Sequence, residues 1–190
     1  MRTAIFGGTF DPIHCAHLAV AREAAVAFDL DRVLFVVAAH PPHKPGIRIE
    51  SFEHRLRMTE IACASEPLFE ASDIEAGAAQ SYSIYTLEKL RARLGADDSL
   101  FFLIGADAFA EIRTWYRWRD VISVVEFIVV ARPGHEFTIP DGAIVHRLDT
   151  LALPISSSAI RAELAAGGSP AQVPAPVLAY IRENQLYRQV

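Results

Sequence analysis

Short apolar runs alternate with segments of helical periodicity along most of the chain. Runs such as Phe127-Ile128-Val129-Val130 are typical of strands buried on both faces of a parallel sheet. We expect strands at Thr3–Phe6, Val33–Val37, Leu68–Ser72, Leu100–Ile104, Glu126–Val130 and Ala143–Val145. We expect helices at Ala16–Phe28, Phe52–Ser65, Ile84–Leu94, Asp107–Trp115, Ser157–Ala166 and Pro174–Asn184. The alternation predicts an α/β fold, with an open, mostly parallel sheet and helices on both faces.

The length of 190 residues suits a single domain with a sizeable core. The linker Gly167-Gly168-Ser169-Pro170 joins the last two expected helices. We therefore expect residues 155–190 to form a small helical C-terminal appendage rather than a second domain.

Charge and composition exclude several classes of protein. The formal net charge of −5 argues against a nucleic-acid partner, because such proteins are normally basic. No apolar run approaches the length of a membrane span, and the N-terminus lacks a signal-peptide pattern. The two cysteines, Cys15 and Cys63, predict reduced thiols and a cytoplasmic location without a membrane partner. An acidic chain that binds phosphate must gather its cations locally, and Lys44, Arg132 and Arg161 are candidates.

The first expected strand runs directly into the turn Gly7-Gly8-Thr9-Phe10-Asp11-Pro12 and then into a helix that begins near His14. Glycines let backbone N–H groups approach a phosphate, and a helix N-terminus adds positive potential. His14 and His17 are three residues apart, which places both imidazoles on one face of the first helical turn. A plain turn or a zinc site are the alternatives, but zinc needs a third and usually a fourth ligand. The combination indicates a nucleotide phosphate.

Two common nucleotide fingerprints are absent. The turn does not contain Gly-x-Gly-x-x-Gly, and the chain does not contain Gly-x-x-x-x-Gly-Lys-Ser/Thr. The turn with its two histidines instead resembles the signature of the nucleotidyltransferase superfamily. A second motif, Ile155-Ser156-Ser157-Ser158-Ala159-Ile160-Arg161, resembles the superfamily's Ile-Ser-Ser-Thr-x-Ile-Arg. Further segments, at 42–44, 81–87, 102–107, 115–118 and 130–134, are similar to bacterial nicotinate-nucleotide adenylyltransferases. The resemblance covers the whole chain and implies a Rossmann-like nucleotidyltransferase domain over residues 1–190.

By this resemblance, the chain transfers the adenylyl group of ATP directly to nicotinate mononucleotide, in NAD biosynthesis. Mg²⁺, carried mainly by the ATP phosphates, is the expected cofactor, and no metal-binding side chains are expected. The implied catalytic residues are His14, His17, Lys44 and Arg161. The implied ATP-binding residues are Gly7, Gly8, Thr9, Phe10, His14, His17, Gly105, Asp107, Ile155, Ser156, Ser157 and Arg161. The implied mononucleotide-binding residues are Gly8, Lys44, Tyr82, Thr86, Trp115, Tyr116 and Arg132.

Simpler structural roles are possible for several of these residues. The segment around Lys44 could be a solvated loop, a serine before Ile160 could cap a helix, and Arg161 could form a surface ion pair. The tryptophans 115 and 118 could be core aromatics.

The chain departs from the resembled motifs at three positions. Ala16 stands where the family has glycine, Tyr85 where it has aspartate, and Ser158 where it has threonine. These differences leave open a slower or specialised paralogue. The choice between the acid and the amide mononucleotide as substrate is open as well. An adenylyltransferase for nicotinamide mononucleotide or phosphopantetheine, and a non-catalytic dinucleotide sensor, are the alternative functions. The oligomeric state, monomer or homodimer, is also open.

Overall fold

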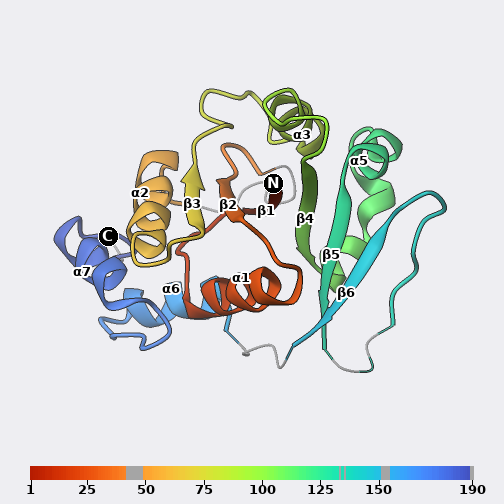
Figure 1. Ribbon diagram of the computed structural model, residues 1–190. Helices are drawn as coiled ribbons and strands as arrows, with labels where there is room; N and C mark the ends of the chain where they lie inside the picture. The colour runs from red at the N-terminus through yellow and green to blue at the C-terminus, as the bar shows by residue number, and fades with distance from the viewer. Residues whose placement is uncertain (42–48, 133, 135, 151–154, 189–190) are drawn as a thin grey trace.

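The computed structural model describes residues 1–41, 49–132, 134, 136–150 and 155–188. Six strands form one sheet in the order β3-β2-β1-β4-β5-β6, and all the neighbouring pairs are parallel (Figure 1). The strands are β1 (Arg2–Gly8), β2 (Arg32–Val37), β3 (Phe69–Ser72), β4 (Ser99–Gly105), β5 (Glu126–Ala131) and β6 (Val145–Asp149). This is the strand order of a doubly wound, Rossmann-like fold, so the predicted fold class is confirmed.

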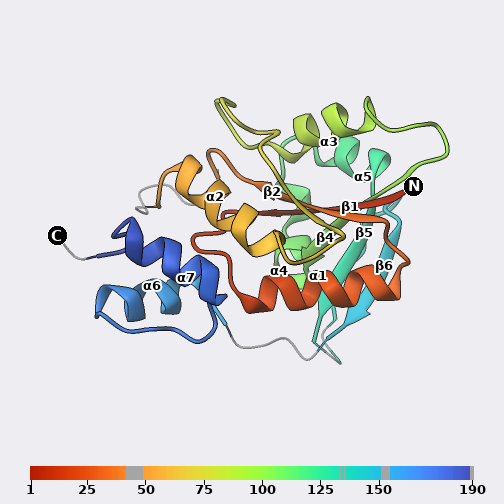
Figure 2. The ribbon, with the colours of Figure 1, turned by 60° about the vertical axis from the view of Figure 1, so that its left-hand side comes forward.

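Helices cover both faces of the sheet, as Figure 2 shows. One face packs against α1 (Cys15–Ala27), α2 (Phe52–Cys63), α6 (Ser157–Ala165) and α7 (Ala175–Glu183). The other face packs against α3 (Ser83–Arg91), α4 (Ala106–Ala110), the 3₁₀ helix Ile112–Thr114 and α5 (Trp118–Val124). Along β4, Phe101 and Leu103 belong to the first apolar cluster, whereas Phe102 and Ile104 belong to the second. Alternate strand residues therefore fill two cores.

The single helix predicted at Asp107–Trp115 is wrong. Helix α4 ends at Ala110, the 3₁₀ helix follows, and Trp115 is extended with φ −72° and ψ 144°. Arg117 then adopts the left-handed conformation with φ 52°, and α5, which the sequence analysis missed, begins at Trp118. No glycine or proline marks this change of direction, so the pattern of residues gave no signal for a break.

The last strand lies later in the chain than predicted. The expectation was Ala143–Val145, but β6 begins at Val145 and ends at Asp149. It is an edge strand that pairs with β5, and Leu148 is its one buried residue. Because an edge strand needs little apolar surface, its pattern was too weak to locate it.

Helices α6 and α7 lie together beside α1 and α2 (Figure 2). Ile160 of α6 and Val177 and Ile181 of α7 are buried in the same cluster as α1. The loop between the two helices also contacts the start of α1, where the Cys15 N–H donates to the Gln172 carbonyl over 2.8 Å. The C-terminal helices thus contact the turn that follows β1. Within the described residues, no helix is both long and apolar enough to cross a membrane.

Candidate active site

The turn after β1 is held in one conformation by its own side chains. A Cβ atom on Gly8 would lie 2.7 Å from ring carbons of Phe10, so a larger residue at this position would displace that ring. Phe10 has φ 48° and a ring that is 2 % exposed, in contact with the rings of Phe6 and Phe35. Phe10 therefore anchors the turn in the core through its side chain.

A cavity of about 240 Å³ lies beside this turn, at the carboxyl ends of the strands. Its lining includes Gly7, Gly8 and Thr9 from β1 and the turn, Gly105 at the end of β4, and Trp115. Between β1 and β4 the strand order changes direction, which is where open α/β sheets bind their ligands. The structure therefore brings the predicted glycines and Trp115 together at one cavity.

His14 and His17 are adjacent, as predicted from their spacing. Their rings stack with centroids 3.7 Å apart and planes 20° apart. The backbone N–H of His14 donates to Nδ1 of His17 over 3.2 Å, which leaves the proton of a neutral His17 ring on Nε2. The ring of His17 also meets the edge of Phe10 at 5.2 Å. Two imidazoles are thus fixed at the N-terminus of α1, with Ala16 in its first turn.

His14 is 5 % exposed, and its Nδ1 is a buried atom without a hydrogen-bond partner. Burial lowers its pKa to about 4, because desolvation disfavours the imidazolium. At neutral pH the ring is therefore uncharged.

This lowered pKa predicts a loss of stability in acid. The unfolded chain binds a proton at His14 below about pH 6.5, whereas the folded chain resists it down to about pH 4. The free energy of unfolding should therefore fall as the pH drops through this window, by up to about 1.4 kcal/mol per pH unit from this one group. Urea unfolding of the native chain and of His14→Gln between pH 4.5 and 7.5 measures the difference. Parallel curves for the two proteins would contradict the assignment.

The serine-arginine motif at residues 155–161 contacts the turn that follows β1. Arg161 donates to the carbonyl of Asp11 over 2.7 Å, and Ser157 donates to the carbonyl of Pro12 over 3.1 Å. Ser156 caps α6 by accepting the N–H of Ala159, as its alternative role predicted. The Arg161 side chain is 21 % exposed and lies 3.7 Å from the buried carboxylate of Asp11, so it is not a surface ion pair. The motif therefore fixes the turn and places a cation next to it.

Arg55 on α2 is a residue that the sequence analysis missed. It is 1 % exposed and donates to the carbonyls of Thr9, Ala38 and Glu50 at 2.7–2.9 Å. Burial lowers its pKa, although the nearby Asp11 opposes that effect. Since Thr9 follows β1 and Ala38 follows β2, this guanidinium joins two loops at the ligand edge of the sheet. The one signal in the sequence is its position on the buried face of α2, with Met58 and Ala62.

The side predicted for the mononucleotide contains a cluster of three tyrosines. The rings of Tyr82 and Tyr116 stack with centroids 4.6 Å apart, and the Tyr85 hydroxyl donates to that of Tyr116 over 3.4 Å. The hydroxyl of Thr86 is buried and donates to Glu75 over 2.7 Å. Glu75 lines the cavity at Gly8 and also a second cavity of about 580 Å³ that Thr86 borders. Thr86 is thus separated from the first cavity by a buried carboxylate.

The remaining candidate residues occupy separate places. Asp107 is exposed in the first turn of α4, two residues after Gly105. Ile155 packs against the core beside α6, and exposed Arg132 follows β5 without lining the cavity at Gly8. Lys44 lies outside the described residues.

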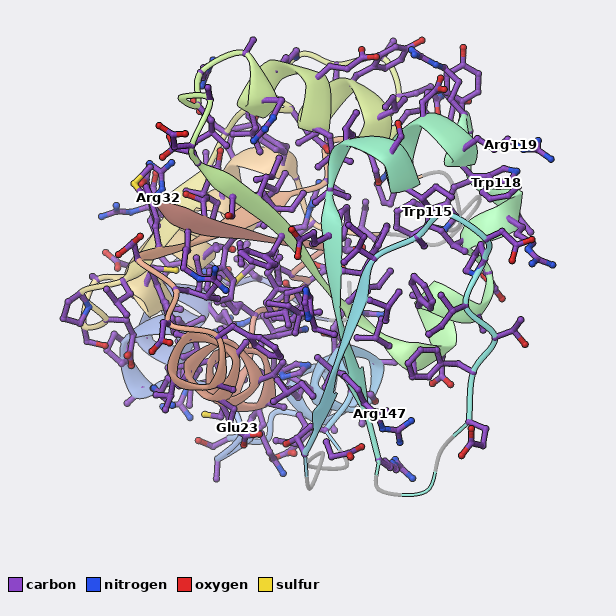
Figure 3. All side chains as sticks on the ribbon, turned by 45° about the vertical axis from the view of Figure 1, so that its right-hand side comes forward. Glu23, Arg32, Trp115, Trp118, Arg119 and Arg147 are labelled. Atoms are coloured by element: carbon purple, nitrogen blue, oxygen red, sulfur yellow. The ribbon has the colours of Figure 1, made fainter. Side chains whose placement is uncertain are left out.

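Trp118, the second tryptophan considered in the sequence, has a mainly structural role. Trp118 packs against the second core cluster, and the guanidinium of Arg119 lies 4.5 Å from the centre of its ring. Figure 3 shows Trp115, Trp118 and Arg119 on the same side of the molecule, close to α5. The structure therefore supports the core role for Trp118 and the cavity-lining role for Trp115.

Comparison with known proteins defines the class. The cytidylyltransferase-like family model matches residues 5–163, which include both the histidine turn and the serine-arginine motif. A nicotinic acid mononucleotide adenylyltransferase of Plasmodium falciparum, solved in complex with NaAD, has the same fold, with a TM-score of 0.78 over 98 % of this chain and 97 % of that chain. At 21 % identity this likeness concerns the fold alone. The family match and the fold are those of a nucleotidyltransferase.

Two curated relatives define the family more narrowly. A protein of Solibacter usitatus is 59 % identical over 98 % of this chain and all of its own length, and one of Citrifermentans bemidjiense is 41 % identical over 98 % of each. Both are described as probable nicotinate-nucleotide adenylyltransferases. The chain belongs to the nicotinate-nucleotide adenylyltransferase family of enzymes, which confirms the resemblance found in its sequence.

Proposed function

We propose that this site transfers the adenylyl group of ATP to the 5′-phosphate of nicotinate mononucleotide, giving nicotinate adenine dinucleotide and pyrophosphate. The observation that carries the proposal is the stacked pair His14 and His17 at the N-terminus of α1, which follows directly on the turn whose glycines line the cavity. Membership of the family at 59 % identity to a full-length relative supports the substrates. The reaction is a step of NAD biosynthesis.

The chain's part in the reaction is to position the substrates and to stabilise charge. The mononucleotide phosphate attacks the α-phosphorus of ATP, the bond from the α-phosphorus to the bridging oxygen breaks, and pyrophosphate leaves. His17 donates its Nε2 proton in a hydrogen bond to a phosphate oxygen, and uncharged His14 lies beside it. Hydrogen bonds to oxygens whose charge grows in the transition state lower the barrier. The reaction needs no covalent intermediate on the protein.

The proposed ATP contacts lie on the turn after β1, at the end of β4 and at the start of α6. The turn 7–10, Gly105, Asp107 and the segment at Ser156 and Ser157 form the set, with Arg161 supplying positive charge at the turn. The donors around the turn are N–H groups, hydroxyls and imidazoles, which suit phosphate oxygens. We propose that Mg²⁺ comes with ATP, because this ion prefers oxygen ligands and commonly binds substrate phosphates. When bound it neutralises phosphate charge.

The mononucleotide lies, in this proposal, between the turn and the aromatic residues beyond α4. Trp115 lines the cavity and Tyr116 is 47 % exposed, so their rings are available to the pyridine ring. Tyr82 stacks on Tyr116 and supports it, and the start of α3, where Ser83 lines the cavity, offers a positive end to the nicotinate carboxylate. Lys44 and Arg132 are proposed for the phosphate of the mononucleotide.

Product analysis tests the proposed function. Purified protein is incubated with ATP, Mg²⁺ and nicotinate mononucleotide, and the products are identified by chromatography and mass spectrometry. We expect nicotinate adenine dinucleotide and pyrophosphate in equal amounts. Tight binding of dinucleotide without any pyrophosphate would instead identify a sensor, and turnover with phosphopantetheine alone would identify another adenylyltransferase.

A further inference from the structure

The C-terminal end of the described chain reaches the turn that carries the two histidines. The hydroxyl of Tyr187 donates to Oδ1 of Asp11 over 2.7 Å, between residues 176 positions apart. Asp11 is 1 % exposed, so this is a hydrogen bond to a buried carboxylate. Such bonds are short and strong because the acceptor is charged.

The position of Tyr187 is set by the residues just before it. After α7 the chain reverses through Gln185, which has φ 55°, and Leu186 is buried in the same core cluster as α1 and α2. The backbone N–H of Tyr187 then donates to Oε1 of Glu50 over 3.3 Å. Tyr187 is thus held at both its backbone N–H and its hydroxyl, and the hydroxyl also lies 4.0 Å from the sulfur of Met58 on α2.

The buried carboxylate of Asp11 accepts hydrogen bonds from few donors. Its Oδ1 accepts the Tyr187 hydroxyl and, over 3.3 Å, the N–H of Glu50. Its Oδ2 is buried and has no hydrogen-bond partner, although the Arg161 guanidinium lies 3.7 Å away. Because a buried carboxylate is costly without donors, loss of the Tyr187 hydroxyl should make Asp11 rearrange.

A rearrangement of Asp11 would change the positions of the His14 and His17 rings. Phe10, directly before it, packs edge-on against the ring of His17 at 5.2 Å. Directly after it, Pro12 and Ile13 lead to His14, whose backbone N–H holds Nδ1 of His17. We propose that Tyr187 is a positioning residue for adenylyl transfer, and that its hydrogen bond to Asp11 holds the turn so that His14 and His17 meet the phosphates in the reactive geometry.

Tyr187→Phe tests this proposal because it removes one hydroxyl and keeps the ring. Tyr180→Phe is the matched control, since the Tyr180 hydroxyl bonds Nδ1 of His54 over 2.9 Å and ties α7 to α2 away from the turn. Each variant loses one hydroxyl from the C-terminal segment that packs on α2, so a purely structural role would give the two similar effects. Thermal unfolding of both verifies that they fold.

The first readout is the set of imidazole resonances in ¹H–¹⁵N NMR spectra, assigned with His14→Gln, His17→Gln and His54→Gln. We expect Tyr187→Phe to shift the resonances of His14 and His17, and Tyr180→Phe to shift that of His54 alone. The second readout, which rests on the proposed function, is the kinetics with ATP and nicotinate mononucleotide. We expect kcat/KM for ATP to fall about 10-fold in Tyr187→Phe and to stay within about twofold in Tyr180→Phe.

Unmoved His14 and His17 resonances in a folded Tyr187→Phe protein would overturn the proposal, as would equal losses of kcat/KM in the two variants. If the native protein forms no dinucleotide, the proposed function fails, yet the imidazole resonances still decide whether Tyr187 positions the histidines. The two failures are therefore distinguishable.

Discussion

His17→Ala should lower kcat by about 10²- to 10³-fold, which is the usual effect of removing one hydrogen-bond donor to a developing negative charge. The ring stacks on His14, and its Nδ1 accepts a backbone N–H, so a neutral ring carries its proton on Nε2, the nitrogen that we propose donates to a phosphate. Initial rates of pyrophosphate release at saturating ATP and nicotinate mononucleotide measure the effect.

His146→Gln is a suitable control for this prediction. His146 lies on the edge strand β6, where its Nε2 bonds Glu126 over 2.7 Å, and it is not part of the histidine turn. Its replacement should leave kcat within about twofold, because surface changes outside a site have small effects. A folded His17→Ala protein with native turnover would remove this residue from the mechanism.

Arg55→Lys should destabilise the protein by about 2–4 kcal/mol, because a charged hydrogen-bond donor contributes about 1.5–3 kcal/mol and more than one is lost. The planar guanidinium of Arg55 donates to three carbonyls at 2.7–2.9 Å, and a lysine ammonium cannot reproduce that fork. The half-buried carbonyls of Thr9 or Ala38 would lose their donor. Urea unfolding monitored by circular dichroism measures the change.

Arg57→Lys gives the matched comparison on the same helix. Arg57 is 59 % exposed and pairs with Glu60 over 2.9 Å at the surface, where ion pairs contribute little. Its replacement should change the free energy of unfolding by less than about 0.5 kcal/mol. Equal stability of the Arg55→Lys and Arg57→Lys proteins would show that the two loops do not depend on the buried guanidinium.

The sequence predicted most of the sheet because its strands are buried on both faces and so read as continuous apolar runs. For this reason the strand predicted at Glu126–Val130 matches β5 to within one residue. The edge strand β6 and the helix after Arg117 were misplaced or missed, since one is half exposed and the other follows a left-handed residue that no glycine marks.

The histidine pair was predictable because residues 14 and 17 are three apart at a helix start, although His14 is the extended N-cap and its N–H holds the ring of His17. The support around the pair was not predictable in this way. The partners of Arg55 are backbone carbonyls on two other segments, and Tyr187 meets Asp11 across 176 positions. Such contacts exist only after the strands have assembled, so local patterns do not reveal them.

The most direct test of the central claim compares the two pyridine mononucleotides as adenylyl acceptors. Pyrophosphate release by the native protein is measured with ATP and Mg²⁺ and with either nicotinate or nicotinamide mononucleotide. The account predicts rapid release with the acid, and a kcat/KM for the amide at least about 10-fold lower, because a carboxylate at the positive end of α3 contributes more than an amide there. Preference for the amide would contradict the assigned pocket, and no release with either acceptor would contradict the proposed reaction.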